Sequence, residues 1–346
     1  MSRTYRAAII GLGFVGCGDP VSGERLGQDP RNLDGTHFSG YQNSPRVQLV
    51  AGCDRDPGNR KRFEARSGAA VYADAAEMLQ AQQPEIVSVA TYTPSHPDLT
   101  QLCFAHGVRA VYCEKPMAQT LAGAEAMRAA EQAAEGLLVI NHNRRFHPNF
   151  LQLRDLIRSG DLGNLTGVTA RWPTGRLGNV GTHFIDLIRM CTGREVLAVS
   201  GTLDLSEKPD CRGDAFHDPG GWGVFRLEGG LMATFHAANF ALGPAEIRFE
   251  GTAGWASTNG DTVDVRWLDG RTDHWASPRA EATSMDRAVS HIVRWLDGEG
   301  GFPVSSEDAL RTLEVLIGVH ASHARDAAWT PLPLQGSDRQ KALNSG

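Results

Sequence analysis

The sequence RAAIIGLGFVG, at residues 6–16, joins an apolar run to a turn rich in glycine. The apolar run predicts a buried strand, and the glycines permit a tight turn directly after it. Glycines in this pattern also let the backbone approach a pyrophosphate group closely. Because the pattern directly follows an N-terminal strand, we favour a dinucleotide-binding turn over a plain glycine turn. The expected cofactor contacts are Gly11, Gly13, Phe14, Val15 and Gly16.

A second apolar run, residues 47–53, ends at Asp54. A carboxylate in this position usually binds the ribose hydroxyls of NAD. The distance from Gly16 exceeds the usual spacing of about 20 residues, and an insertion between the two accounts for the excess. Arg55 follows at once and could hold a 2′-phosphate, so NAD is the expected cofactor and NADP is the alternative. The strand-end position favours ribose binding over a plain turn role for Asp54.

The segment from Cys17 to Gly35 departs from the usual dinucleotide-binding pattern. A phosphate-binding helix is expected near Gly16, but the residues that follow are rich in Gly, Asp and Pro, which break helices and form turns. A helical pattern resumes over residues 36–43. We interpret the insertion as a surface loop. The alternative is a flap over the cofactor or an arm toward a neighbouring subunit.

Strands and helices then alternate up to residue 141, which predicts βαβ units and a mostly parallel sheet. The carboxyl ends of such strands are where α/β proteins bind ligands. A turn with small hydroxyl groups follows the strand expected at residues 85–90. We expect cofactor contacts there from Thr91, Thr93, Pro94 and His96, although a histidine in such a loop is more often structural.

The strand expected at residues 108–113 ends in Glu114-Lys115-Pro116. Burying the charge of a lysine is costly unless the charge is paired or used. Lys115 is therefore a candidate functional group, and an ordinary strand-end lysine is the competing interpretation. Both Glu114 and Lys115 are expected to contact the cofactor.

The second half of the chain has a different pattern. Strand-like runs recur between residues 166 and 268 with little helix between them, and helices are expected over 285–296 and 306–326. This pattern predicts an antiparallel sheet with helix packed on it. The sequence thus predicts an α/β protein: a Rossmann domain over residues 1–141, and an α+β domain over residues 142–346 with an open, predominantly antiparallel sheet.

The stretch from Gly178 to Asp186, GNVGTHFID, carries the most chemistry in this half. Thr182 is a plausible N-cap, which would put His183 in the first turn of a helix. The positive end of a helix disfavours imidazolium and so promotes a neutral, basic imidazole. Asp186 lies three residues on, on the same helical face, and could orient the ring. A capping histidine and a surface aspartate are the competing interpretation.

Composition excludes several classes of function. The chain has 346 residues, 41% hydrophobic and 21% charged, and a net charge of -6, which argues against nucleic acid or an anionic membrane as a main partner. No apolar run reaches spanning length, and no signal peptide is recognised. The six cysteines show no metal-ligand spacing, so no metal is expected and a reducing, cytoplasmic setting fits.

These motifs occur together in a recognisable order. The glycine turn, Asp54, Glu114-Lys115-Pro116 and the Asn-x-Gly-Thr-His-x-x-Asp run from Asn179 resemble the glucose–fructose oxidoreductase/inositol dehydrogenase (Gfo/Idh/MocA) family. Arg144-Arg145-Phe146 and Asp161-Leu162-Gly163 add to the resemblance, which spans nearly the whole chain. The combination is far more specific than any single motif.

The resemblance implies NAD(P)-dependent hydride transfer at a hydroxyl-bearing carbon of a sugar, cyclitol or sugar derivative. It implies that Lys115 and His183 are catalytic and that the Lys115–Pro116 bond is cis. It also implies that the open sheet forms a subunit interface, so a homodimer or homotetramer is expected. The family often has Asp where this chain has Asn179. Because Asn cannot accept a proton, the acid–base work is left to His183 and Lys115.

We expect His183 to take the hydroxyl proton while Lys115 stabilises the developing oxygen charge and Asn179 hydrogen-bonds the substrate or His183. Residues that flank the cleft motifs are expected to bind a polyhydroxylated substrate: Asn143, Arg144, Trp172 and Arg176. Two rival functions stay open. One is an enzyme that keeps NAD bound and oxidises a sugar transiently without net redox. The other is a non-catalytic NAD(P)-sensing regulator.

Overall fold

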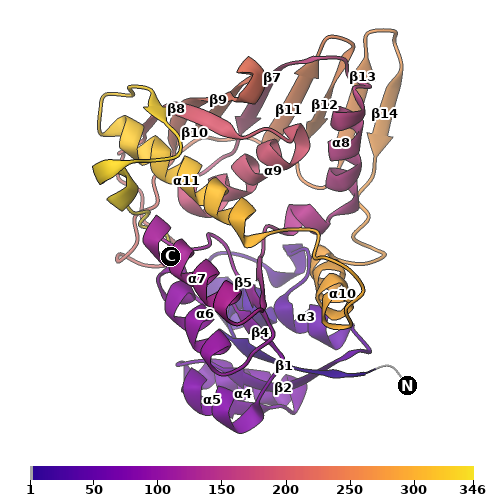
Figure 1. Cartoon of the computed structure of the whole chain (residues 1–346), viewed down its shortest axis with the longest axis vertical. Coiled ribbons are helices and arrows are strands. Elements are labelled where there is room, and N and C mark those ends of the chain that lie inside the picture. The colour runs from indigo at the N-terminus through magenta and orange to yellow at the C-terminus, as the bar shows by residue number, and fades with distance from the viewer. Residues whose placement is uncertain (1–2) are drawn as a thin grey trace. The chain divides into compact units, whose positions relative to one another are not determined.

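The computed structural model describes residues 3–346, and the chain divides into two compact units (Figure 1). Unit 1 comprises Met1–Ala118, Ala122–Asn143 and Glu281–Glu307, and unit 2 comprises Gln119–Leu121, Arg144–Ala280 and Asp308–Gly346. The expected boundary after residue 141 falls close to the passage at residues 143–144. The chain returns to unit 1 after residue 280, and local sequence patterns did not predict this return.

Unit 1 is built on a six-stranded sheet whose order is β3-β2-β1-β4-β5-β6. Every pairing in this sheet is parallel. The predicted Rossmann-type sheet is therefore confirmed. Its strands are β1 (Tyr5–Ile10), β2 (Val47–Cys53), β3 (Ala70–Tyr72), β4 (Ile86–Val89), β5 (Ala110–Cys113) and β6 (Leu137–Ile140).

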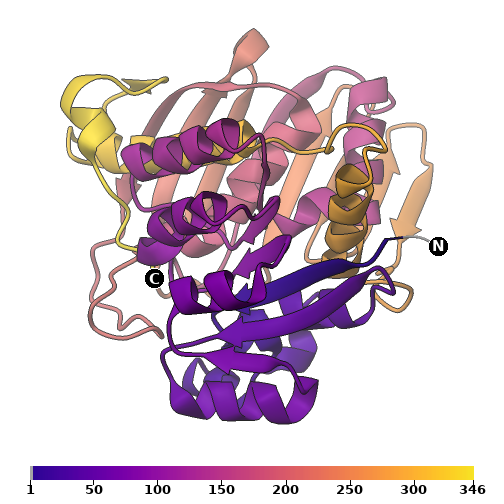
Figure 2. The ribbon, with the colours of Figure 1, turned by 60° about the horizontal axis from the view of Figure 1, so that its bottom comes forward.

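Helices connect these strands, and their starts follow from local capping. Asp56 and Asp74 accept backbone N–H bonds at the starts of α4 and α5, two helices that pack against β2 (Figure 2). The helices of unit 1 are α1 (Phe14–Cys17), α2 (Pro20–Arg25), α3 (His37–Gln42), α4 (Pro57–Ser67), α5 (Ala75–Gln82), α6 (His96–Ala105), α7 (Leu121–Ala133) and α10 (Ser284–Leu296), with short 3-10 turns η1 (Pro30–Asn32) and η2 (Thr93–Ser95).

The insertion after the glycine turn is more ordered than its composition suggested. A helix of four residues starts at Phe14 and ends at Gly18, whose φ of 63° is the left-handed region that favours glycine. A further helix, α2, follows where only turns were expected, because Asp19 caps it and Pro20 occupies its first position. The Asp19 carboxylate is 2% exposed and pairs with Arg62 of α4 at 2.6 Å. This buried pair fastens the insertion to the body of unit 1.

Unit 2 contains a nine-stranded sheet whose order is β14-β13-β12-β11-β7-β10-β9-β8-β15. All pairings are antiparallel except that between β7 and β10, so the predicted sheet type is confirmed. Its strands are β7 (Leu165–Arg171), β8 (Val196–Leu203), β9 (Gly221–Leu227), β10 (Met232–Ala237), β11 (Glu246–Gly251), β12 (Gly254–Thr258), β13 (Val263–Trp267), β14 (Thr272–Trp275) and β15 (Thr330–Pro331).

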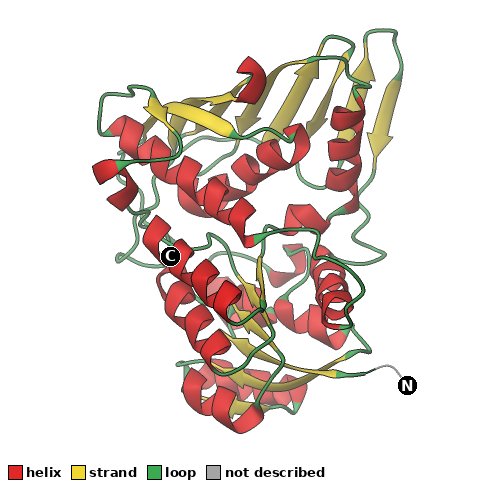
Figure 3. Cartoon of the chain, in the orientation of Figure 1, coloured by secondary structure: helices red, strands yellow, loops and turns green. Residues whose placement is uncertain are grey.

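Three long helices lie along one face of this sheet, as Figure 3 shows: α8 (Pro148–Ser159), α9 (Thr182–Thr192) and α11 (Ser306–His323). Strand β10 illustrates the consequence, because Ala233, Phe235 and Ala237 are buried while the residues between them are exposed. Shorter helical turns are η3 (Asn143–Phe146), η4 (Leu177–Gly181), η5 (Glu228–Gly230) and η6 (Gly336–Gln340). Within residues 3–346 no helix has the length and apolar character needed to span a bilayer.

Candidate active site

The glycines in the turn at the end of β1 are needed for two different reasons, the backbone geometry of the turn and the space beside it. Gly11 has a φ of 96°, and a Cβ placed on Gly16 would lie 1.9 Å from the carbonyl oxygen of Gly11. The turn itself therefore requires glycine at both positions. A Cβ on Gly13 would meet nothing nearer than the Ser22 hydroxyl at 3.6 Å. Since the described protein does not demand glycine there, Gly13 fits the close approach of a ligand.

Asp54 is held beside this turn at the end of β2. One carboxylate oxygen accepts the backbone N–H of Leu12 at 2.8 Å and the Asn59 amide at 3.1 Å. The other oxygen accepts the backbone N–H of Asp56 at 2.8 Å. An ionised carboxylate has about four acceptor sites, so capacity remains for a ribose hydroxyl. Arg55, the alternative contact for a 2′-phosphate, is exposed.

The loop after β4 lies at the same edge of the sheet. Thr93 is 1% exposed, and its hydroxyl has no hydrogen-bond partner among the described residues. A buried hydroxyl without a partner is costly, so it marks a place where a ligand atom fits. Thr91 accepts a hydrogen bond from the Ser95 hydroxyl at 2.7 Å, and Pro94 is exposed. Gly13, Asp54 and Thr93 together fit an adenine dinucleotide.

His96 lies in the interior below that loop. Its ring nitrogens lie 3.0 Å from the Pro116 carbonyl oxygen and 3.1 Å from the Thr91 carbonyl oxygen. Burial lowers the pKa of this histidine. The ring thus links the loop after β4 to the loop after β5, which is the structural role that the sequence left open beside a cofactor contact.

Glu114 and Lys115 follow β5, and the Lys115–Pro116 bond is cis, as the resemblance implied. Lys115 is half-buried, whereas Glu114 is 6% exposed. The Glu114 carboxylate lies 3.2 Å from the ring of His37 and accepts from Asn141 at 2.6 Å. Burial alone would raise the pKa of Glu114, but the hydrogen bonds and the attraction of His37 and Lys115 lower it to about 2. Glu114, predicted to touch the cofactor, is thus enclosed by protein donors.

Sequence reasoning did not find His37. The histidine stands 77 residues before Glu114 in the chain, at the first position of α3, and its side chain is fully buried. No local motif connects the two, so only the fold brings them together.

The helix that carries His183 does not start as predicted. Gly181 has helical dihedrals and Thr182 continues a π-helical turn, η4, so Thr182 is not an N-cap. The N–H groups of Val180 and Gly181 are already bonded to the Arg176 carbonyl. His183 is the second residue of α9 and so lies in its first turn as predicted, but a π-helical turn precedes that turn in place of a capped helix end.

Asn179 lies in η4 and is 5% exposed. Its backbone N–H and that of Gly178 donate to the two oxygens of the buried Asp218 carboxylate, each at 2.7 Å. Burial raises the pKa of Asp218. With the Asn179 amide oxygen turned toward Arg212, it accepts from both terminal guanidinium nitrogens, one of them at 2.9 Å. A cation therefore faces the position where the family often has a carboxylate.

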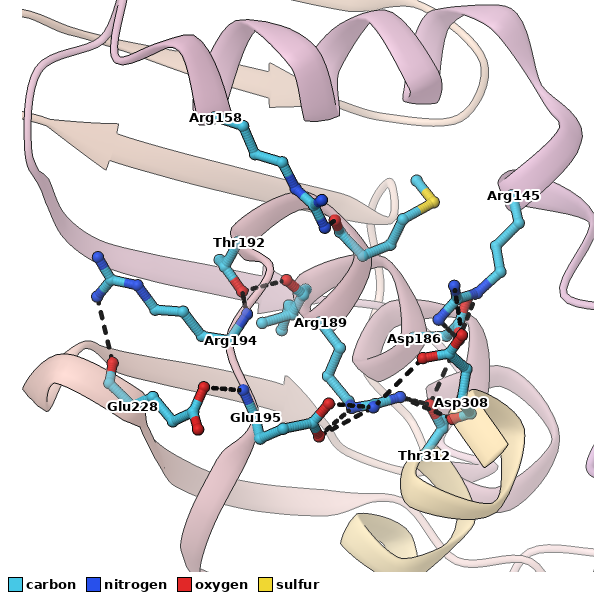
Figure 4. Close-up of polar contacts among 12 residues, drawn as sticks. Arg145, Arg158, Asp186, Arg189, Thr192, Arg194, Glu195, Glu228, Asp308 and Thr312 are labelled. Carbon is cyan, nitrogen blue, oxygen red and sulfur yellow. Dashed lines mark hydrogen bonds and ion pairs between the residues drawn. The ribbon is translucent and has the colours of Figure 1, made fainter. Parts of the chain in front are cut away.

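Asp186, the residue suggested to orient His183, is engaged by Arg145 on both carboxylate oxygens (Figure 4). These distances lie between 2.8 and 3.0 Å, and Asp186 is 1% exposed. Arg189, one turn along α9, forms a two-pronged pair with Glu195 and donates to the Asp308 carbonyl at 2.7 Å. This paired network holds η3, α9 and the start of α11 together.

The four residues predicted to bind substrate occupy different environments. Trp172 is 1% exposed and stacks between the rings of Phe184 and Phe235, at 4.7 and 5.8 Å, so it is a core residue. Arg144 lies over Phe184 at 4.5 Å and donates to the His183 carbonyl at 3.2 Å.

The other two substrate candidates, like Arg144, are half-buried. Arg176 has a φ of 62° and lines a small cavity together with Lys208 and Asp218, and Asn143 is half-buried in η3. No group of three or more potential metal ligands occurs in the part of the chain that the structure describes.

Two family models match this chain. Residues 5–142 match the oxidoreductase family with an NAD-binding Rossmann fold, and residues 173–257 match the Gfo/Idh/MocA C-terminal domain. The first match assigns the chain to the class of NAD-binding oxidoreductases. Together the two matches cover more than half of the chain. The protein belongs to the Gfo/Idh/MocA family, as the resemblance implied.

Several relatives have been named for their activity or pathway. The chain is 33% identical over 162 residues to D-apiose dehydrogenase of Paraburkholderia graminis, which covers 46% of this chain and 38% of the relative. It is 32% identical over 200 residues to the rhizopine catabolism protein MocA of Rhizobium meliloti. This match covers 53% of this chain and 57% of the relative. It is 29% identical over 232 residues to inositol 2-dehydrogenase of Acidothermus cellulolyticus. This match covers 63% of this chain and 61% of the relative. The match thus spans about half the length of these relatives.

Solved structures show the same fold along nearly the whole chain. Aldose-aldose oxidoreductase from Caulobacter crescentus superposes with a TM-score of 0.79 at 21% identity, covering 95% of this chain and all of the other. The WlbA dehydrogenase from Bordetella pertussis, solved with NADH and UDP-GlcNAcA, gives 0.76 at 20% identity, covering 97% and 99%. At such identities the likeness establishes the fold alone.

Proposed function

We propose that this protein is an NAD(P)-dependent oxidoreductase that transfers hydride between nicotinamide and a hydroxyl-bearing carbon of a sugar, cyclitol or sugar derivative. The observation that supports the proposal is that Gly13, Asp54, Thr93 and Lys115 follow four strands that are neighbours in the unit 1 sheet, β1, β2, β4 and β5. Membership in the family and the dehydrogenase names of the relatives support the substrate class.

Each catalytic side chain has one role. The bound nicotinamide supplies the hydride acceptor or donor. His183 takes the proton of the substrate hydroxyl, and Lys115 stabilises the charge that develops on the oxygen. Asn179 hydrogen-bonds the substrate or His183, and because it cannot take up a proton, His183 is the base. The contact between Arg144 and the His183 carbonyl fixes the backbone that carries this base.

The cofactor would be held by the glycine turn, Asp54 and the loops after β4 and β5. We propose contacts from Gly11, Gly13, Phe14, Val15, Gly16, Asp54, Arg55, Thr91, Thr93, Pro94 and Lys115. The buried His96 and Glu114, also expected to contact the cofactor, lie against protein groups and support the loops that make these contacts. Asp54, a fixed anion, repels a 2′-phosphate, so NAD is preferred to NADP. Comparing the Kd values of the two cofactors tests this preference. Asn143, Arg144 and Arg176 are the proposed substrate contacts, with Trp172 supporting them from the core.

We also propose that the protein is cytoplasmic and assembles as a homodimer or homotetramer. The six cysteines are free, which suits a reducing compartment. The face of the large sheet opposite its helices exposes apolar groups, including Trp222 at 41% and Met232 at 37%. Exposed apolar patches of this kind mark interaction sites. Sedimentation of the parent and of a Trp222→Glu variant would show a loss of subunits if this face is the interface.

The proposed reaction is tested with a panel of sugars, cyclitols and sugar acids, each offered with NAD and NADP and followed at the nicotinamide absorbance. Lys115→Ala and His183→Ala should each lower kcat by about 10²–10⁴ while NAD binding and the circular dichroism spectrum stay unchanged. Full activity in either variant would contradict the assigned roles. Product formed without any absorbance change would instead indicate the cycle without net redox, and cofactor binding without turnover would indicate a regulator.

A further inference from the structure

The insertion after the glycine turn is connected to Asp54 by an unbroken series of side-chain contacts within unit 1. The Asp19 carboxylate of the insertion accepts from Nε of Arg62 at 2.6 Å and from a terminal nitrogen of Arg62 at 3.0 Å. The same terminal nitrogen donates to the amide oxygen of Asn59 at 2.5 Å. The Asn59 amide nitrogen donates to Oδ2 of Asp54 at 3.1 Å. Two side chains therefore join the insertion to the acid that we propose to bind the ribose.

The amide of Asn59 has a single orientation that suits both of its neighbours. The Arg62 guanidinium carries donors alone, and the ionised Asp54 carboxylate only accepts. In the reversed amide the NH2 group would face the guanidinium and the oxygen would face the carboxylate, so both contacts would become repulsive. Asn59 is 8% exposed, which leaves water little access to replace either contact. Arg62 therefore decides that the donor of Asn59 faces Asp54.

This donor completes the protein contacts of one Asp54 oxygen. Oδ2 accepts from the backbone N–H of Leu12 at 2.8 Å as well as from Asn59, and Oδ1 accepts from the backbone N–H of Asp56 at 2.8 Å. Because each carboxylate oxygen offers about two acceptor sites, these contacts fill Oδ2 and leave room at Oδ1. The carboxylate is thus fixed in rotation, with Oδ1 ready to accept a ribose hydroxyl.

Arg62 is itself held by the insertion. Asp19 caps α2 by accepting the backbone N–H of Ser22 at 2.8 Å, and its side chain is 3% exposed. A guanidinium bound at two points to a carboxylate has its plane fixed. Without that carboxylate, the Arg62 side chain, which is 33% exposed, could turn toward solvent and leave Asn59. The position of the insertion therefore matters for the orientation of Asn59.

We propose that Arg62 and Asn59 are positioning residues for NAD: the insertion holds Arg62, Arg62 orients the Asn59 amide, and Asn59 fixes the Asp54 carboxylate for the adenosine ribose. A carboxylate that is already oriented binds more tightly, because less ordering has to occur when the ligand arrives. The proposal rests on the proposed contact between Asp54 and the ribose. It requires neither movement of the insertion nor a second subunit, so it differs from a flap and from an arm.

A matched control lies one turn further along α4. Arg66 also reaches the insertion, because its guanidinium donates to the Cys17 carbonyl at 2.8 Å. This bond fastens the insertion without passing through Asn59. Loss of either arginine should loosen the insertion, but the loss of Arg62 alone should change how Asp54 is held.

The test measures Kd by isothermal titration for NAD and for an NAD analogue whose adenosine ribose lacks both hydroxyls. The proteins are the parent, Asn59→Ala, Arg62→Met, the double variant of these two, Arg66→Met and Asp54→Ala. The parent should prefer NAD by about tenfold, the size of one hydrogen bond to a charged group. Asn59→Ala and Arg62→Met should each reduce this preference by about threefold or more, through weaker binding of NAD, while Arg66→Met should keep it.

The double variant tests whether Arg62 acts through Asn59. If it does, Arg62→Met should cause no further loss of preference when Asn59 is already alanine. Two independent losses that add would overturn the proposal. So would a parent-like preference in Asn59→Ala or in Arg62→Met, or an equal loss of preference in Arg66→Met, which would mean that the insertion only needs to be fastened.

A second form of the Arg62 variant guards against misfolding. Arg62→Met leaves the buried Asp19 carboxylate without its partner, which is strongly destabilising. If this variant does not fold, Asp19→Asn combined with Arg62→Met removes both charges and still deletes the donor to Asn59. The same loss of preference is expected in that protein, and an unchanged preference would overturn the proposal.

Asp54→Ala separates this proposal from the one on which it rests. If Asp54→Ala keeps the preference of the parent for NAD, the ribose contact is wrong and the positioning role falls with it. If Asp54→Ala loses the preference while Asn59→Ala keeps it, the ribose contact stands and the positioning role alone is overturned. Neither result depends on turnover, so the proposed hydride transfer is tested separately.

Discussion

Two of the buried carboxylates, Glu114 of unit 1 and Asp186 of unit 2, are held by different sets of partners. In unit 1, the Glu114 carboxylate lies 3.2 Å from the His37 ring and accepts a hydrogen bond from the neutral Asn141 amide. In unit 2, Asp186 is held by the guanidinium of Arg145 (Figure 4). Hydrogen bonds from neutral donors fix an anion without cancelling its charge. A bidentate arginine does both.

This difference indicates two kinds of function for a buried acid. The Asp186 network continues into further pairs, such as Arg189 with Glu195, and its effect is to hold elements together. The Glu114 carboxylate has no arginine partner, and the attraction of Lys115, the next residue in the chain, helps to lower its pKa. Replacing each acid in turn should therefore change stability in unit 2 and both stability and pH response in unit 1.

The largest expected effect is in the paired network. Asp186→Ala leaves the Arg145 guanidinium, whose side chain is 9% exposed, without its bidentate partner. Breaking one partner of a buried pair costs about 3–5 kcal/mol of unfolding free energy, which urea denaturation measures. The matched control is Glu195→Gln, because the Glu195 side chain is 44% exposed and should contribute less than about 1 kcal/mol. Equal losses in both variants would contradict the distinction.

The next effect concerns Glu114 and pH. The folded-state pKa of about 2 lies below the ordinary value of 4.5, so ionised Glu114 stabilises the fold above about pH 4.5 and this contribution disappears as the pH falls toward 2. Its full size is on the order of 3 kcal/mol at most. The stability difference between the parent and Glu114→Gln should shrink between pH 5 and pH 3. A difference that stays constant over this window would mean that Glu114 is not held as an anion.

The glycine turn offers a sharper contrast within unit 1. Gly13→Ala should lower NAD affinity about tenfold or more, equivalent to about 1.4 kcal/mol, with an unchanged melting temperature, because only a ligand competes with the new methyl group. Gly16→Ala should lower the melting temperature itself, since its Cβ would lie 1.9 Å from a carbonyl oxygen. Isothermal titration with NAD and thermal unfolding separate the two. A destabilised Gly13→Ala variant with normal affinity would reverse the interpretation.

The smallest effect is expected at Asn179. In Asn179→Asp the new carboxylate would face Arg212 and form a charge pair like those around Asp186. At this 5% exposed position the attraction to Arg212 should offset the cost of burying the new charge, so the free energy of unfolding should change by no more than about 1 kcal/mol. If His183 is the only base, the acidic limb of the pH–rate profile, where the base becomes protonated, should stay in place. An acidic limb moved to lower pH would show that the introduced carboxylate takes part in proton transfer.

Much of the fold could be predicted because its signals are local. The apolar run at residues 47–53 coincides with β2, and the helix expected over residues 285–296 begins one residue earlier and ends where predicted, since their apolar patterns and flanking turns are clear. The glycine turn, Asp54 and Lys115 were located by their place at strand ends. Strand β14 lies beyond residue 268, where the expected strand-like runs end, because it has few apolar residues and periodicity alone does not reveal it.

The candidate site was less predictable where it depends on distant contacts or on an unusual backbone. The pairing of His37 with Glu114 joins residues 77 positions apart. The π-helical turn before α9 removed the expected cap at Thr182, and π-helical turns have no reliable sequence signal. Trp172 was predicted to bind substrate because of its position in the chain, yet its burial could be known only from the packed sheet.

One consequence of the cysteine distribution is practical. Five of the six cysteines are buried, and burial raises the pKa of thiols such as Cys17, which leaves them unreactive toward maleimides. Cys211 is exposed, and it directly precedes Arg212, the residue that faces Asn179. The parent protein therefore carries a single natural attachment point for a fluorescent dye, whose emission would report ligand-induced changes around η4 without any engineered cysteine.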